Sequence, residues 1–101
     1  MKQRHAEVIT ANASRYLQQL CKHWSHKFSV DFTATHGKIA LPFGPCILDA
    51  DDRKLSIALS AEAADLPKFE NVVEDHIRRF AFREELSFVW HDGEAAIPSR
   101  R

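Results

Sequence analysis

Residues 13–34 read ASRYLQQLCKHWSHKFSVDFTA, and the spacing of the apolar residues changes once within this stretch. In the first half, apolar residues recur three and four positions apart, which is the spacing of one face of an α-helix. From Phe28 to Ala34 apolar and polar residues alternate, which indicates a β-strand with one buried face. The stretch therefore predicts a helix followed by a strand. The apolar positions of the helix are Ala13, Tyr16, Leu17, Leu20, Cys21 and Trp24.

The same two patterns place the other elements. Residues 5–10 predict a short first strand, and Asn12 has the side chain of a helix N-cap. His36-Gly37 and Gly44-Pro45 have the composition of turns between strands. Asp65 is expected to cap a second helix. The inner face of that helix consists of Leu66, Phe69, Val73, His76, Ile77 and Phe80. Further strands are expected at residues 28–34, 39–43, 46–50, 55–61 and 86–90.

The resulting order is strand, helix, four strands, helix, strand. It predicts an α+β fold, a two-layer sandwich in which a mostly antiparallel sheet of about six strands carries both helices on one face. We expect one domain over residues 1–92 and a flexible tail over residues 93–101. The outer sheet face is expected to be small and polar, and to be solvated or to contact a partner. Its residues are Ser29, Asp31, Thr33, Ala40, Asp49, Ser56, Ala58 and Ser60.

Length and composition exclude several classes of protein. The chain has 101 residues, 14 basic and 14 acidic side chains, and a formal net charge of zero at pH 7. This length fits one small domain and excludes a (β/α)₈ barrel. No apolar stretch approaches the roughly 20 residues that cross a bilayer, and residues 1–7 lack the apolar core of a signal peptide. Two cysteines are too few for a disulfide scaffold. We therefore expect a cytoplasmic protein without membrane contact.

The neutral total conceals two oppositely charged halves. Residues 1–50 carry a net charge of +3 and residues 51–101 carry −3. About three phosphate contacts from the first helix would give only weak nucleic-acid binding, so nucleic acid is not the favoured partner. For the first helix, either a solvated basic surface or a site for an anion or an acidic partner fits this charge pattern. Separately, the arginines of residues 78–83 can clamp a carboxylate or phosphate, although local salt bridges with Glu84 and Glu85 are the simpler interpretation. The candidate contacts are Arg15, Lys22, Lys27, Arg79 and Arg83.

Residues 21–26, CKHWSH, have the linear spacing of metal ligands. On a helix, Cys21 and His23 point about 160° apart and cannot bind one ion together. His23 and His26 share a flank and can offer two imidazoles to one metal. The simpler interpretation is a solvated flank near a helix C-terminus, where the helix dipole favours a cationic imidazole.

A second combination of residues depends on the fold. Cys21 and His76 lie on the inner faces of the two helices, and Cys46 is in phase with the buried residues of its strand. With His23 they can form a thiolate and imidazole site, or a cysteine nucleophile with a histidine base. The simpler interpretation is that the cysteines act as small core side chains and His76 as a structural hydrogen-bonding group.

Several strings resemble the bacterial domain-of-unknown-function family 2218 over roughly residues 5–91. The more specific strings are residues 20–27, LCKHWSHK, and residues 79–86, RFAFREEL. Pro42-Phe43-Gly44, Cys46 and His76 also match the family. The resemblance implies a small bacterial cytosolic protein of no established activity, and related domains are sometimes joined to siderophore-interacting flavin-dependent reductases. It gives weight to a ligand or metal site at the positions that coincide with the family strings. These positions are Cys21, His23, His26, Cys46 and His76.

Three functional hypotheses follow. The first and favoured one is a non-enzymatic domain that binds a small ligand or a protein partner, as an accessory to iron or siderophore handling. The second is a metal- or thiol-dependent enzyme that uses Cys21, Cys46 and His76. The third is a structural module that forms a homodimer through the outer sheet face. The sequence requires no cofactor, and a transition metal belongs to the second hypothesis.

Overall fold

The computed structural model describes residues 1–93 of the chain. The strands are β1 (Lys2–Ile9), β2 (Val30–Phe32), β3 (His36–Leu41), β4 (Gly44–Ala50), β5 (Lys54–Ala61) and β6 (Trp90–Asp92). The helices are α1 (Ala13–Trp24) and α2 (Leu66–Phe80), and a 3₁₀ turn, Ala63–Asp65, precedes α2. Within these residues the strands form one antiparallel sheet in the order β2-β3-β4-β5-β1-β6. Beyond Gly93, the expected tail lies outside the described residues.

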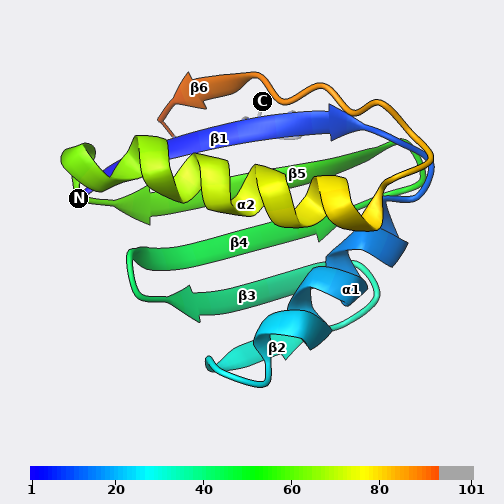
Figure 1. The fold of residues 1–101 in the computed structure, drawn as a ribbon, viewed down its shortest axis with the longest axis horizontal. Coiled ribbons are helices and arrows are strands. Elements are labelled where there is room, and N and C mark those ends of the chain that lie inside the picture. The colour runs from blue at the N-terminus through cyan, green and yellow to red at the C-terminus, as the bar shows by residue number, and fades with distance from the viewer. Residues whose placement is uncertain (94–101) are drawn as a thin grey trace, which may run out of the picture.

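Both helices lie against the same face of the sheet (Figure 1), which confirms the α+β fold and the element order predicted from the sequence. α1 packs over β2, β3 and β4, whereas α2 packs over β5. Every predicted inner-face residue of α1 is buried, because the apolar stripe of this helix faces the sheet. In α2, Phe69, Val73 and Ile77 are fully buried, but His76 and Phe80 are only half-buried. These two residues lie where the helix layer meets solvent.

The opposite sheet face is free of helices in the part of the chain that the structure describes. Its predicted residues are all exposed or half-exposed, as expected for a small and polar surface. His36 and Asp49, which are paired across β3 and β4, form a hydrogen bond there with 2.7 Å between Nδ1 and Oδ1. Lys54 and Glu7 form an ion pair on the same face, with 3.0 Å between Nζ and Oε1.

The turn between β2 and β3 lies earlier than the sequence predicted. The chain turns at residues 33–35, so His36 and Gly37 begin β3 and the predicted turn at these two residues is wrong. The hydroxyl of Thr33 accepts hydrogen bonds from the backbone N–H groups of Thr35 (3.3 Å) and His36 (3.1 Å). A hydroxyl that bonds to the following backbone stabilises a turn without glycine.

Gly37 instead serves a close contact. A Cβ atom at this position would lie 2.7 Å from Sγ of Cys21 and 3.4 Å from Cδ2 of Leu17, both in α1. The missing side chain therefore allows α1 to approach β3. A glycine is needed at position 37 because helix and strand are close there, and not because the backbone turns.

The turn between β3 and β4 is at Pro42-Phe43, and Gly44-Pro45 begins β4, contrary to the predicted break. Gly44 has φ of +148°, and a Cβ atom there would lie 2.0 Å from the carbonyl oxygen of Ser60. Pro45 pairs with Ala40 of β3, but the N–H of Ala40 bonds to Ser29, so these two residues exchange no ladder bonds. Because pairing of β4 with β5 begins only at Cys46, the missing N–H of Pro45 is tolerated.

The last strand lies later than predicted. β6 is Trp90–Asp92, which pairs with β1 at Arg4–Ala6, and residues 86–89 form no strand. Leu86 is nevertheless buried, and Arg78 donates a hydrogen bond from Nη1 to its carbonyl oxygen (3.1 Å). The alternation of apolar residues over 86–90 therefore reflects the packing of a segment that lies mostly outside the sheet. In this segment the Leu86 carbonyl is bound by the Arg78 side chain and not by a neighbouring strand.

Candidate functional site

A cleft of about 470 Å³ opens where the end of α1, the β3–β4 turn and the middle of α2 meet. Its volume lies within the range of small-molecule sites. α1 and the residues that follow it contribute His23, Trp24, His26, Lys27 and Phe28. The end of β3 and the β3–β4 turn contribute Leu41, Pro42 and Phe43, and α2 contributes Val72 and His76.

Aromatic and imidazole rings gather on one side of this cleft. The ring centre of His76 lies 4.8 Å from that of Trp24 and 5.1 Å from that of His23. The ring of Phe80 lies 6.1 Å from His23 in an edge-on arrangement. These distances are those of contacting rings. The cluster arises because His23 and Trp24 end α1 beside the flank of α2 that carries His76 and Phe80.

A hydrogen bond fixes the orientation of the His76 ring. Nδ1 of His76 lies 2.7 Å from the carbonyl oxygen of Val72, one helical turn earlier. Because a carbonyl oxygen only accepts, Nδ1 is the donor and carries a proton. Nε2 is therefore the nitrogen of His76 that is left for a ligand.

The charges around the cleft are positive. Contact with neighbouring groups removes water from the His23 ring and lowers its pKa, and the positive charges of His76, His26, Arg79 and Lys27 lower it further. Among residues 1–93, no Asp or Glu side chain lines this cleft. The cleft thus combines apolar walls with an edge of cationic and titratable side chains.

The two thiols lie elsewhere. Cys21 and Cys46 are both fully buried free cysteines in the core between helices and sheet. Burial raises the pKa of Cys21 to about 11, and burial together with the nearby Cys21 raises the pKa of Cys46. A thiol with a raised pKa is neither a ready nucleophile nor a ready metal ligand.

The structure thus divides the predicted ligand set in two. His23, His26 and His76 lie at the cleft, whereas Cys21 and Cys46 are core residues. Across residues 1–93, no three His, Cys, Asp or Glu side chains gather closely enough to hold a metal ion.

A second hollow, of about 420 Å³, lies at the start of α1 beside the residues after α2. At its base the Glu84 carboxylate accepts hydrogen bonds from Asn12 Nδ2 (2.8 Å), Thr10 Oγ1 (2.9 Å) and the Tyr16 hydroxyl. These bonds, that of Tyr16 first and that of Asn12 next, lower the pKa of Glu84. The sequence predicts that the Asn12 and Asp65 side chains cap the two helices, and both predictions are wrong. The Asn12 side chain bonds to Glu84 instead of capping α1, and Asp65 makes no side-chain cap on α2.

The predicted basic contacts are distributed over both hollows. Lys27 lines the cleft, and the positive charge of Arg79 lowers the pKa of His23 there. Arg15 and Arg83 line the second hollow, where Glu84 already has side-chain donors. Lys22 is exposed on α1 and lines neither. The five residues therefore do not form one anion site.

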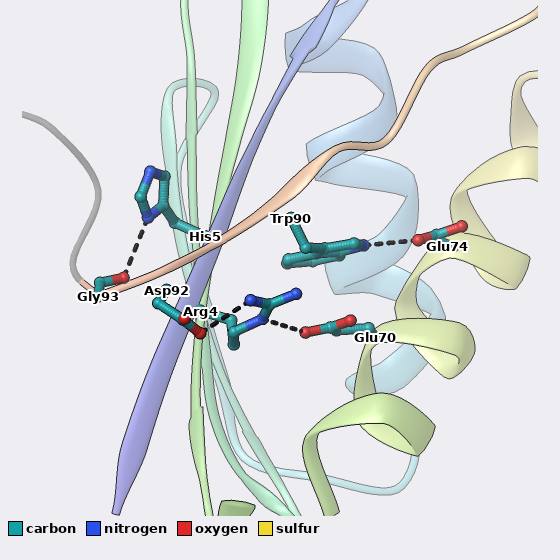
Figure 2. A network of polar contacts seen from close by, with 7 residues as sticks. All are labelled: Arg4, His5, Glu70, Glu74, Trp90, Asp92 and Gly93. Atoms are coloured by element: carbon teal, nitrogen blue, oxygen red, sulfur yellow. Dashed lines mark hydrogen bonds and ion pairs between the residues drawn. The ribbon is translucent and has the colours of Figure 1, made fainter.

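A third polar cluster attaches β6 to the rest of the fold (Figure 2). Arg4 in β1 donates from Nε to Glu70 in α2 (2.7 Å) and from Nη1 to Asp92 in β6 (2.8 Å). Trp90 donates from its indole nitrogen to Glu74 (2.5 Å). Because these groups bond to one another, we assign this cluster a structural role.

Most of the cleft wall has no signal in the sequence alone. The helical spacing indicates only that Trp24 is a core residue, and the alternation indicates only that Phe28 belongs to a strand. No pattern marks Phe43 or Val72 as site residues. The available signal was the cluster of matching family positions around His23 and Pro42-Phe43, but only the fold shows that they face one space.

The fold and the cleft define a class: a small two-layer α+β domain with one helix-covered sheet face and a ring-lined cleft at the edge of the helix layer. The chain belongs to the family described as uncharacterized protein conserved in bacteria, domain of unknown function 2218, whose sequence profile matches residues 5–91.

A solved relative has the same fold. The NMR structure of PA4090 from Pseudomonas aeruginosa is 36% identical, covers 90% of this chain and 96% of that one, and superposes with a TM-score of 0.76. No curated protein matches the chain. Across the described residues, none of the helices combines the length and apolar character needed to cross a membrane.

Proposed function

We propose that this chain is a ligand-binding domain whose cleft holds a small molecule with an aromatic ring. One observation carries the proposal: a cleft of about 470 Å³ is walled by Trp24, Phe28 and Phe43, with imidazoles at its edge. Pockets of this kind, largely apolar with a few polar groups, are typical of small-molecule sites.

The ring contacts favour an aromatic ligand over an aliphatic one. The ring of His76 contacts the rings of both Trp24 and His23, and the ring centre of Phe43 lies 5.3 Å from that of Phe69 in the core. A planar ligand can stack on such rings, and each aromatic pair adds about 0.5–1.5 kcal/mol beyond the burial of area. Phe69 is fully buried, so the wall formed by Phe43 is supported from below.

The finer part of the proposal is an accessory role in iron or siderophore handling inside the cytoplasm. It derives from the family resemblance, in which related domains accompany siderophore-interacting reductases. An aromatic siderophore fragment would be one example of the planar ligand proposed for the cleft. The two unpaired thiols of Cys21 and Cys46 fit a reducing compartment.

The other two hypotheses have less support. A thiol enzyme needs an accessible thiolate, but Cys21 and Cys46 are buried and their pKa values are raised. A homodimer through the outer sheet face remains a prediction, which light scattering at high protein concentration tests.

The ligand proposal is tested with 2-naphthamide, a neutral planar probe, by following amide chemical shifts of the protein. We expect the shifts to concentrate at Trp24, Phe43 and Val72. The Val72→Phe variant should fill the cleft and abolish binding. Val89→Phe is the matched control, because Val89 is 56% exposed and lies outside the cleft. Saturable binding that V72F leaves unchanged would overturn the proposal.

A fluorescence measurement gives an independent result. In the Trp90→Phe variant, Trp24 is the only indole, since the chain has two tryptophans. The emission of this variant should change when 2-naphthamide binds. No change in emission at saturating probe would contradict a ligand beside Trp24.

A further inference from the structure

The groups that surround His23 are either basic or uncharged on each element of the cleft. α1 has no acidic residue, and the segment after it presents His26 and Lys27. α2 presents His76 and Arg79. The end of β3 and the β3–β4 turn contribute only Leu41, Pro42 and Phe43, which carry no charge.

The acidic residues of α2 do not neutralise this edge. Glu70 binds Arg4 on the opposite flank of the helix, and Glu74 binds Trp90 and Arg78. Asp75 is exposed and is not among the residues that line the cleft. Positive charge at the cleft edge therefore lacks an acidic partner within residues 1–93.

We propose that the ligand of this cleft is an aromatic carboxylate, with its ring against Trp24 and Phe43 and its carboxylate at the edge formed by His23, Lys27 and His76. This inference rests on the proposed function, because it names the chemical class of the same ligand. The proposed function specifies only an aromatic ring, and the present inference adds a negative charge on the ligand.

The donors at the edge suit a single carboxylate. Nδ1 of His76 is committed to Val72, so protonation places a donor at Nε2. The ammonium of Lys27 and a protonated His23 supply further charge-assisted donors, which are roughly twice as strong as neutral ones. A phosphate is less suitable, because among residues 1–93 no glycine lines the cleft, so it offers no glycine-rich phosphate-binding loop. Apolar walls also disfavour a multiply charged, strongly hydrated group.

The test compares two ligands of nearly equal shape, 2-naphthoate and 2-naphthamide, by calorimetry at low salt and near pH 5.5, because the pKa of His23 lies below 6.5 and the lower pH favours its protonated form. We expect 2-naphthoate to bind about tenfold more tightly, which corresponds to about 1.4 kcal/mol. The variants His23→Gln and Lys27→Gln should bring this ratio close to one. Both residues are exposed, so these variants should fold normally.

Lys22→Gln is the matched control, because Lys22 is exposed on α1 but does not line the cleft. It should leave the ratio unchanged. Equal affinity for the two ligands would overturn the carboxylate assignment while the ligand-binding function stands. Binding of neither ligand would overturn both. A K22Q variant that lowers the ratio as much as K27Q would also overturn the assignment, since general charge and not the cleft edge would then attract the ligand.

Discussion

The hydroxyl of Tyr16 in α1 donates a hydrogen bond to the carboxylate of Glu84, a residue 68 positions later in the chain. The same carboxylate accepts from Asn12 and Thr10. Tyr16 is buried, so its hydroxyl needs a partner within the protein. Glu84 therefore connects the segment after α2 to the first turn of α1.

Replacing Glu84 should destabilise the fold. The Glu84→Gln variant loses the charge that strengthens the bonds from Tyr16 and Asn12, and hydrogen bonds to charged groups contribute about 1.5–3 kcal/mol. Because the glutamine amide oxygen still accepts and neutral hydrogen bonds contribute about 0.5–1.5 kcal/mol, we expect a loss of about 1 kcal/mol in the free energy of unfolding by urea. Glu85→Gln is the control, because Glu85 is exposed and should change stability by less than about 0.5 kcal/mol. Equal losses in both variants would contradict the role assigned to Glu84.

The contribution of Glu84 should depend on pH. Its pKa in the fold is lower than its ordinary value of 4.5, so the unfolded chain takes up a proton first as pH falls. The stabilisation is therefore fully present above pH 4.5 and disappears as pH falls through the pKa of the folded state. Urea unfolding at several pH values should show the difference between wild type and E84Q shrinking in that range. A difference that stays constant down to pH 2 would contradict this assignment.

The two carboxylates that bind Arg4 should contribute unequally. Glu70 is 14% exposed, whereas Asp92 is 93% exposed and its ion pair is screened by water. Exposed pairs contribute about 0–1 kcal/mol. We expect Glu70→Gln to lower the unfolding free energy clearly and Asp92→Asn to leave it almost unchanged. Chemical denaturation of both variants measures this, and a larger effect of D92N would refute the ranking.

Gly37 and Cys21 should be energetically coupled. In Gly37→Ala the new Cβ would meet Sγ of Cys21, and overpacking of this kind costs about 1–3 kcal/mol. Cys21→Ala removes the sulfur, so the double variant should be more stable than the sum of the single changes predicts. Gly44→Ala is the contrast, because its obstacle is the backbone oxygen of Ser60 and no side-chain change relieves it. Strict additivity of the two changes at 37 and 21 would disprove the coupling.

Carboxylate binding should respond to the protonation of His23. The pKa of His23 is below its ordinary value of 6.5, so the free ring is neutral near pH 7.5. Affinity for 2-naphthoate should therefore increase as pH falls, and bound 2-naphthoate should raise the pKa of His23. The ring-proton signal of His23 in an NMR titration reports both effects. The signal of His36, on the outer sheet face, serves as the reference.

The sequence predicted the elements well, because the relevant information is local. The helical spacing from Ala13 to Trp24 and the alternation from Leu55 to Ala61 each record burial on one side of a regular element. Both elements form as predicted. The inward direction of Cys21 and Cys46 followed from the same periodicities, and both thiols are buried.

The errors arose where a residue serves a distant contact. Gly37 and Gly44 have the composition of turns, but each is required by proximity to another element, α1 or β5. The cleft has the same origin. Its walls come from segments near residues 23, 42 and 76, and no local pattern shows that these segments meet. The sequence predicts His76 on the inner face of its helix, and only the packing of α1 beside α2 puts it at an edge with His23.

Because both thiols are buried, their reaction with a thiol reagent can measure how often α1 separates from the sheet. Sγ of Cys21 occupies the space that a side chain at Gly37 would need, and both sulfurs are inaccessible to solvent. A thiol reagent can therefore react only with molecules in which α1 has separated from the sheet. The rate of labelling at low denaturant measures how often that separation occurs, and a cleft ligand that bridges α1, the β3–β4 turn and α2 should slow the labelling of both cysteines.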